Sequence, residues 1–362
     1  MALTPLQQRI STPRQAEYRG STVAAAFSSP EAEYAAFSHG CAIYDLGFRA
    51  QLHVRGADRV RWMNGMVTNN VRDLAAGHGV YAFLLNPQGH ILGDMFVFNV
   101  GDSLMVETDR SQVEKIMAAF DHYIIMDDVE VTDESEQWTA LGISGPQSVE
   151  LLQRVGINFP GLNFLQMASA TCDCDCGCVQ CTVIRVEGQN SYQIILPPKD
   201  VETTWRTLIA AGATPVGSEV LDVNRIAGGV PLYGVDIRER DLPQETEQAQ
   251  ALNFNKGCYI GQEIVERIRS RGSVHRKFTG FLLESLVSPG ARIFAGEKEV
   301  GEITSVAAIP TAEKQVLALG YIRREAGMPG REVQVAGVPA KVAQFPITGT
   351  SQESIPETVL HN

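Results

Sequence analysis

The sequence lacks a long hydrophobic run. None of its 362 residues lies in an apolar stretch of the roughly 18–20 residues that a membrane-spanning helix needs. The segment from Met1 to Gly20 also lacks the apolar core of a secretion signal, so we expect a soluble, cytoplasmic protein with no membrane partner. Acidic residues outnumber Lys and Arg by 42 to 30, and this excess predicts no direct contact with nucleic acid.

Several common catalytic motifs are missing as well. The chain contains no Walker A loop, no G-x-G-x-x-G after a strand, no H-E-x-x-H and no G-x-S-x-G elbow. A cysteine hydrolase that pairs Cys258 with His275 ranks last among the alternatives, because no third residue that would orient the histidine can be identified.

Helical and strand periodicities are interleaved in mixed order, which predicts an α+β fold rather than a doubly wound parallel sheet. Short strands separated by Gly and Pro after about residue 277 predict a small barrel. We expect a loosely ordered leader over residues 1–29, an α+β core over 30–276, the barrel over 277–347 and a polar tail over 348–362.

A β-hairpin is predicted by two apolar runs, residues 80–85 and 91–100, which flank the turn sequence Asn86-Pro-Gln-Gly89. Asp94 lies in the second run. A carboxylate within an apolar strand is costly unless it is hydrogen-bonded or faces a pocket, so Asp94 is a candidate site residue. The alternative is an edge residue that faces water.

Chemistry-bearing residues are densest between Arg225 and Lys277. Residues 256–277 contain six Lys or Arg against two Glu, and such a basic island can attract an anionic ligand or form a solvated helix face. Cys258 lies between two glycines and beside Lys256, where cations favour the reactive thiolate. Taken alone, a single cysteine is more often a small buried apolar residue.

Five of the seven cysteines crowd into ten residues, which raises the question of a metal site. Same-face cysteines two apart on a strand are separated by ~6.6 Å, whereas sulfurs that share a zinc ion lie nearer ~4 Å. We therefore expect a chemically idle loop. The alternative is soft-metal binding by Cys172, Cys174, Cys176, Cys178 and Cys181.

A family resemblance rests on the segment Lys256-Gly-Cys-Tyr-Ile-Gly-Gln-Glu263 and the upstream Pro243-Gln-Glu-Thr246. Together they resemble the signature of YgfZ-type proteins, which are folate-binding relatives of the glycine-cleavage T-protein, an aminomethyltransferase. Weaker similarity extends over roughly residues 40–345. The resemblance implies a folate-binding core of two α+β subdomains, discontinuous in sequence, with a C-terminal β-barrel and tetrahydrofolate in a central cavity.

The resemblance also implies roles for individual residues. Asp94 would face the folate amines, and Cys258 would be the reactive thiol. Two departures from the transferase pattern are Gln189, where a glutamate is expected, and Leu221, where an arginine is expected to hold the glutamate tail of the folate. The remaining folate contacts implied are Arg185, Gln189, Arg225, Tyr233, Lys256 and Arg271.

The favoured interpretation is a YgfZ-type protein that binds tetrahydrofolate, which can be polyglutamylated, and supports iron–sulfur cluster assembly or repair, with an indirect effect on tRNA modification. Its partners would be iron–sulfur client or assembly proteins, and Cys258 would contact a cluster transiently. One alternative is an aminomethyltransferase that passes a one-carbon unit to tetrahydrofolate. Another is a non-catalytic metal carrier built on the cysteines between Cys172 and Cys181.

Overall fold

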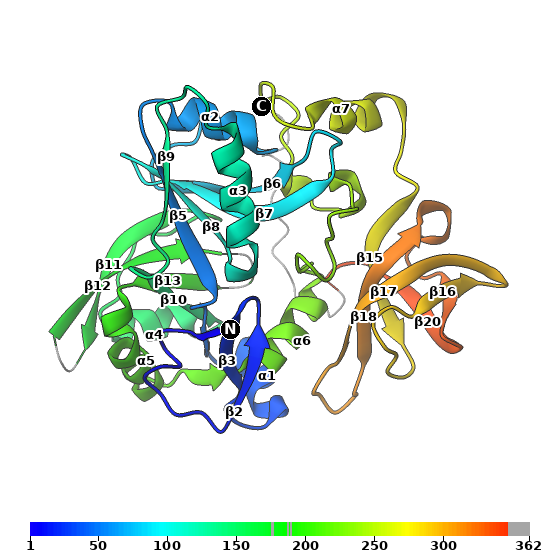
Figure 1. Cartoon of the computed structure of the whole chain (residues 1–362). Helices are drawn as coiled ribbons and strands as arrows, with labels where there is room; N and C mark the ends of the chain where they lie inside the picture. Colours follow the sequence, from blue (N-terminus) through cyan, green and yellow to red (C-terminus); the bar gives the residue numbers. More distant parts are fainter. Residues whose placement is uncertain (175–176, 187, 189, 347–362) are drawn as a thin grey trace.

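The computed structural model describes residues 1–174, 177–186, 188 and 190–346. Two large β-sheets with their helices form one part of the molecule, and a closed barrel lies to one side of them (Figure 1). The predicted α+β class with a C-terminal barrel is confirmed. Within the described ranges, no helix is long and apolar enough to cross a membrane.

A five-stranded sheet has the strand order β6-β7-β8-β5-β9, and the predicted hairpin is its β6–β7 pair. One face packs on helices α2 (Arg59–Met66) and α3 (Val113–Tyr123), because Leu52, Val97 and Val106 bury their side chains against the apolar faces of these helices. The strands are β5 (Arg49–Arg55), β6 (His78–Leu85), β7 (Ile91–Asn99), β8 (Leu104–Asp109) and β9 (Glu130–Asp133).

A six-stranded sheet has the order β11-β12-β13-β10-β4-β14. Helices α4 (Ser148–Arg154) and α5 (Val201–Ala210) bury Leu152, Trp205 and Leu208 against it. The strands are β4 (Ala42–Asp45), β10 (Thr139–Ser144), β11 (Met167–Cys174), β12 (Gly177–Arg185), β13 (Tyr192–Leu196) and β14 (Thr214–Val216).

Residues 1–29 are not the loosely ordered leader that the sequence suggests. They form a three-stranded sheet of β1 (Ala2–Leu3), β3 (Ser21–Ala26) and β2 (Arg14–Tyr18), with β3 in the centre. Leu6 and Val23 are buried. The prediction failed because β3 is made of small residues, which carry little hydropathy signal but pack closely against helix α6 (Ser218–Gly228).

The cysteine-rich segment is not a loop. Residues on both sides of its tip form the antiparallel strands β11 and β12, in which Cys172 pairs with Val179 and Ala170 pairs with Cys181. Cys172 and Cys181 are buried in the core of the six-stranded sheet, where they act as small apolar residues. Cys176 lies outside the described residues.

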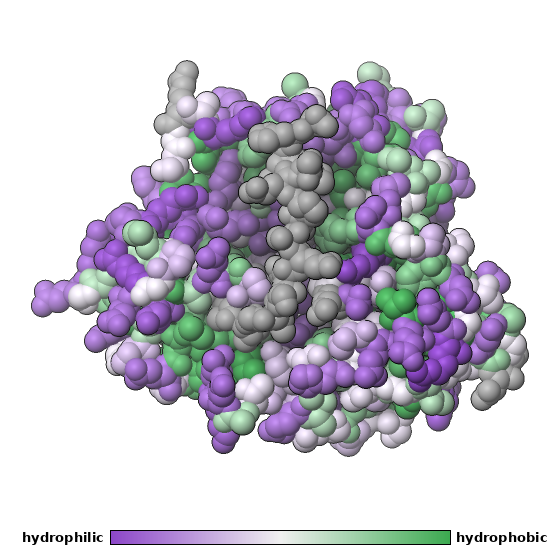
Figure 2. Space-filling model, turned by 180° about the vertical axis from the view of Figure 1, so that it is seen from behind, coloured by the Kyte–Doolittle hydropathy of each residue, from purple (hydrophilic) through white to green (hydrophobic). Residues whose placement is uncertain are grey.

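The barrel closes in the order β15-β18-β17-β16-β19-β20 and follows helix α7 (Gln262–Arg271). Figure 2 shows the molecule from behind, and hydrophilic and hydrophobic residues are mixed over this face, including the surface of the barrel. The strands are β15 (Arg276–Leu283), β16 (Arg292–Ala295), β17 (Lys298–Ala308), β18 (Val316–Arg323), β19 (Glu332–Val335) and β20 (Val338–Ala343).

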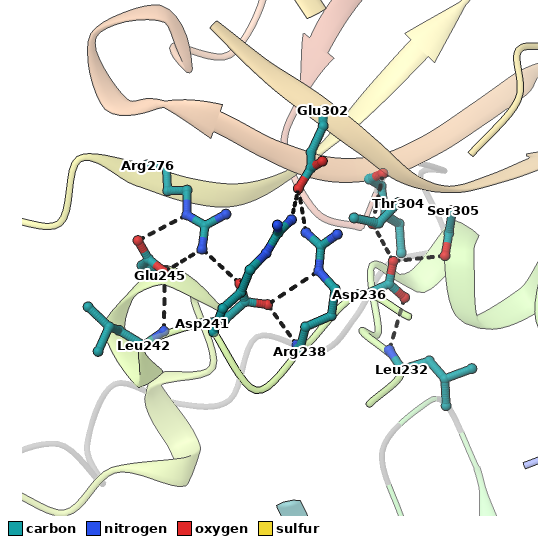
Figure 3. A network of polar contacts seen from close by, with 12 residues as sticks. Leu232, Asp236, Arg238, Asp241, Leu242, Glu245, Arg276, Glu302, Thr304 and Ser305 are labelled. Carbon is teal, nitrogen blue, oxygen red and sulfur yellow. Dashed lines mark hydrogen bonds and ion pairs between the residues drawn. The ribbon is translucent and has the colours of Figure 1, made fainter. Parts of the chain in front are cut away.

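A polar network joins the barrel to the segment that follows α6 (Figure 3). On one side Asp236, which is fully buried, accepts hydrogen bonds from Thr304 and Ser305 of β17. On the other side Arg276 of β15 pairs with Asp241 at 2.7 Å and with Glu245 at 2.9 Å. Because the three carboxylates are buried and paired, the network fixes the barrel against the core.

Candidate functional site

A cavity of about 400 Å³ lies between the two large sheets. One wall is the face of the five-stranded sheet that does not pack on α2 and α3, and the register of the strands places Tyr81, Asp94 and Phe96 together on it. The facing wall includes Tyr44 and Gln193 of the six-stranded sheet. Helix α1 (Pro30–His39) and α6 complete the lining, so that most of the chain converges on this space.

Asp94 faces this cavity, as the sequence analysis suggests. Its Oδ1 accepts a hydrogen bond from Gln112 Nε2 at 2.7 Å, and its Oδ2 accepts one from the Tyr81 hydroxyl at 2.8 Å. Burial and the nearby charge of Asp109 raise the pKa of Asp94, against the lowering effect of these two hydrogen bonds. The carboxylate is thus held in a fixed orientation and is a better proton acceptor than an exposed aspartate.

Charged residues that the sequence analysis missed lie on the same sheet face. Arg49 of β5 donates to Glu107 at 2.7 Å and also pairs with Asp109, both on β8. The signal for them was present, because Glu107 and Asp109 follow the apolar run of residues 104–106 in a strand that is fully buried. This signal was overlooked because the sequence alone does not show that the strand is buried, which depends on the elements packed around it.

Arg225 and Tyr233 also line the cavity. Arg225 is a buried residue whose guanidinium donates to Asp236 at 2.7 Å and to Asp222 at 2.5 Å. The Tyr233 hydroxyl donates to the carbonyl of Leu92 on the Asp94 strand and accepts from Lys115. Both residues therefore frame the cavity wall, and their polar groups are already engaged.

Arg185 supports the cavity from outside the lining. Its Nη1 donates to the carbonyls of Val186 and Gly188 at 2.8 Å and of Ser191 at 2.9 Å. These three carbonyls belong to the segment after β12, which borders the cavity. Gln189, within that segment, lies outside the described residues, and so does the side chain of Arg271 at the end of α7.

Lys256 does not line the cavity. It is buried, and its Nζ donates to the carbonyls of Asn64 and Val67 at the end of α2. The ammonium also lies 4.8 Å from the ring centroid of Tyr259. Burial lowers the pKa of Lys256 to about 7. In the structure this lysine anchors the signature segment to α2.

The signature segment supports the hairpin that carries Asp94. Gly261 has a φ of +79°, and a Cβ there would lie 2.6 Å from the carbonyl oxygen of Asn86, so only glycine fits between the two turns. Cys258 is exposed in the same segment but is not part of the cavity lining. The thiol and Asp94 are thus connected through packing and do not share one pocket.

The spacing argument about the cysteines is wrong for one pair. Cys172 and Cys174 point to the same face of β11, and their sulfurs lie 3.4 Å apart, because rotation about χ1 brings side chains closer than their backbone spacing. Burial raises the pKa of the thiols of Cys172 and Cys181, which disfavours the thiolate form. Among the described residues, no group of three or more His, Cys, Asp or Glu could hold a metal ion.

The cavity suits a flat ligand that is partly apolar and carries N–H groups. Its volume is within the range of roughly 300–1,000 Å³ typical of small-molecule sites. Tyr81, Phe96 and Phe48 give the lining an aromatic character, and Asp94 offers a fixed acceptor.

Comparison with known proteins identifies the family. Residues 10–256 match the GCVT N-terminal domain, and residues 276–348 match the glycine cleavage T-protein C-terminal barrel domain. An aminomethyltransferase of Rubrobacter xylanophilus is 27% identical over 351 residues, covering 95% of this chain and 93% of that protein. A chloroplastic putative transferase of Arabidopsis thaliana is 25% identical and covers 86% of this chain and 72% of its own length.

A solved structure supports the same fold. The glycine cleavage system aminomethyltransferase T from Bartonella henselae superposes with a TM-score of 0.83 at 20% sequence identity, over 92% of this chain and 94% of that one. The two family matches together span most of the described residues, and both sheets and the barrel are accounted for. The chain therefore belongs to the glycine cleavage T-protein family.

Proposed function

We propose that this protein binds tetrahydrofolate in the cavity and acts as an aminomethyltransferase-type enzyme that transfers a one-carbon unit to it. The observation that carries the proposal is the position of Asp94, a hydrogen-bonded carboxylate at the wall of a cavity with aromatic lining. The names of the relatives support this activity over the YgfZ-type role that the signature segment suggests.

In such a transfer the methylene carbon of a lipoyl-bound aminomethyl group leaves its sulfur and its amino nitrogen and bonds to two folate nitrogens. The two N–H protons of the folate leave with the thiol and the ammonia that are released. The role proposed for Asp94 is to accept a hydrogen bond or a proton from a folate amine, and Tyr81 and Gln112 keep its carboxylate in place.

The test combines binding and turnover. Calorimetric titration with tetrahydrofolate should show saturable binding by the wild type. Asp94→Asn should weaken this binding or lower the turnover rate by roughly 10²-fold or more. Asp73→Asn is the matched control, because Asp73 is exposed on the surface and pairs with its neighbours Arg72 and Asn70. Turnover is measured as ammonia and methylene-tetrahydrofolate formed from an aminomethylated lipoyl carrier protein. Equal activity of Asp94→Asn and wild type would contradict the proposal.

A second candidate function is favoured by one observation, the exposed thiol of Cys258 on the YgfZ-like segment. In that case the protein binds folate but supports iron–sulfur proteins through this thiol. Cys258→Ala should then keep its folate affinity but fail to complement a strain defective in iron–sulfur enzymes. Full complementation by Cys258→Ala, together with methylene-tetrahydrofolate production, would leave the transferase as the better explanation.

A further inference from the structure

Among the described residues, three arginines and three carboxylates line the cavity, and they differ in how far their hydrogen-bonding groups are used. The arginines are Arg19, Arg49 and Arg225. All three nitrogens of Arg49 are engaged, because its Nε and Nη1 pair with Glu107 and Asp109 and its Nη2 donates to the carbonyl of Glu107. Its charge is balanced by these two carboxylates, with which a ligand anion would have to compete.

Arg225 is engaged in the same way. Its Nε donates to Asp222, its Nη1 to Asp236 and its Nη2 to the hydroxyl of Ser305 at 3.0 Å. These contacts come from α6, the following segment and the barrel, so the side chain serves the joint between the parts of the molecule. A ligand anion would have to compete with two carboxylates for it.

Arg19 is different. Among the described residues its ion pair is with Asp109 at 3.7 Å, beyond hydrogen-bond distance, and Asp109 is already paired with Arg49. The Nε of Arg19 is buried and finds no hydrogen-bond partner in the described part of the chain. The guanidinium lies 5.0 Å from the ring centroid of Tyr18 and 5.4 Å from that of Phe48, so the two aromatic rings hold it in place.

The backbone of Arg19 has an uncommon conformation with a positive φ. Arg19 and Gly20 form the tight turn between β2 and β3, with φ values of 49° and 93°. Arginine is rare at positive φ, where Asn or Gly is preferred in such turns. The turn is pinned from behind, because Ser111 donates its backbone N–H to the carbonyl of Arg19. Strained residues of this kind cluster at ligand sites.

We propose that Arg19 is the anion-binding residue of the cavity and pairs with a carboxylate of the glutamate moiety of the bound folate. This rests on the proposed function. Arg19 lines the cavity beside Asp109 and Arg49, whose charges act on its guanidinium. Leu221 of α6 also lines the cavity but carries no charge, so in the proposed complex the cation comes from the N-terminal hairpin.

The test compares two probes, tetrahydrofolate and a tetrahydropterin that lacks the p-aminobenzoylglutamate part. Arg19→Gln should weaken tetrahydrofolate binding by roughly 10-fold or more, the loss of one charge-assisted hydrogen bond, and leave binding of the pterin unchanged. Arg14→Gln is the matched control, because Arg14 is on β2, is exposed and pairs with Glu219 outside the cavity. It should bind both probes as the wild type does.

A second measurement does not depend on the folding of a variant. Raising the ionic strength should weaken wild-type binding of tetrahydrofolate, but not of the pterin, because salt screens the ion pair. If Arg19→Gln keeps its tetrahydrofolate affinity, or loses both probes equally, the assignment of Arg19 is overturned while folate binding stands. If the wild type binds neither probe, the proposed function fails and the assignment of Arg19 fails with it.

Discussion

Replacing Asp236 by alanine should destabilise the protein strongly. Asp236 is fully buried and accepts hydrogen bonds from Ser305 at 2.8 Å, the backbone N–H of Leu232 at 3.0 Å and Thr304 (Figure 3). It also accepts one from Arg225 at 2.7 Å. Without the carboxylate, the guanidinium of Arg225 remains buried with only the half-exposed Asp222 to neutralise it.

The magnitude follows from the cost of leaving one partner of a buried ion pair unpaired, about 3–5 kcal/mol. This is a large fraction of a typical free energy of unfolding of about 5–15 kcal/mol. At roughly 2 °C per kcal/mol for a chain of this size, the Tm should fall by about 6–10 °C. Asp236→Asn keeps the shape of the side chain and should cost less than Asp236→Ala.

The assay is urea unfolding followed by tryptophan fluorescence, with calorimetry to detect separate melting of barrel and core. Asp222→Ala is the matched control, because it removes the other carboxylate from the same arginine at a position that solvent reaches, and it should cost at most about 1 kcal/mol. If Asp236→Ala costs no more than Asp222→Ala, the buried network does not hold the barrel to the core.

Two further predictions concern local features. Burial lowers the pKa of Lys256 to about 7, so between that value and the ordinary lysine pKa the unfolded chain binds more protons than the folded one. The free energy of unfolding should therefore rise with pH through this window, by up to about 1.4 kcal/mol per unit, and urea titrations should show no such rise in Lys256→Met. Gly20→Ala should lower the Tm more than Gly337→Ala, because both glycines have positive φ but only at Gly20 would the new Cβ meet a backbone nitrogen, at 2.5 Å.

Much of the local structure could be predicted from the sequence. The hairpin at Asn86–Gly89, the helix that begins at Pro30 after its Ser29 cap, and the run of short barrel strands all follow from turn residues, caps and periodicity. Asp94 was identified because a carboxylate within an apolar strand needs a partner. These signals depend on residues that are close together in the sequence, so they can be read without knowledge of the tertiary structure.

The N-terminal sheet and the cysteine hairpin could not be predicted in this way. Small or polar residues such as those of β3 become core only when another element packs against them. The role of Lys256 was also misjudged. The proximity of Cys258 in sequence suggested an electrostatic partner, whereas the ammonium donates its hydrogen bonds to carbonyls at the end of α2.

The sequence by itself determined the kinds of element, the barrel and the motifs that resemble a folate-binding family, because each depends on residues close together in the chain. Only the tertiary structure decided which charges are free. The sequence alone does not distinguish Arg49, Arg225 and Arg19. The first two form close ion pairs with carboxylates, whereas Arg19 has a longer ion pair of 3.7 Å with Asp109 and an Nε that has no hydrogen-bond partner among the described residues. The physical reason is that the availability of a buried charge depends on its neighbours in space, and those neighbours are brought together only by the packing of the two sheets, α6 and the N-terminal hairpin.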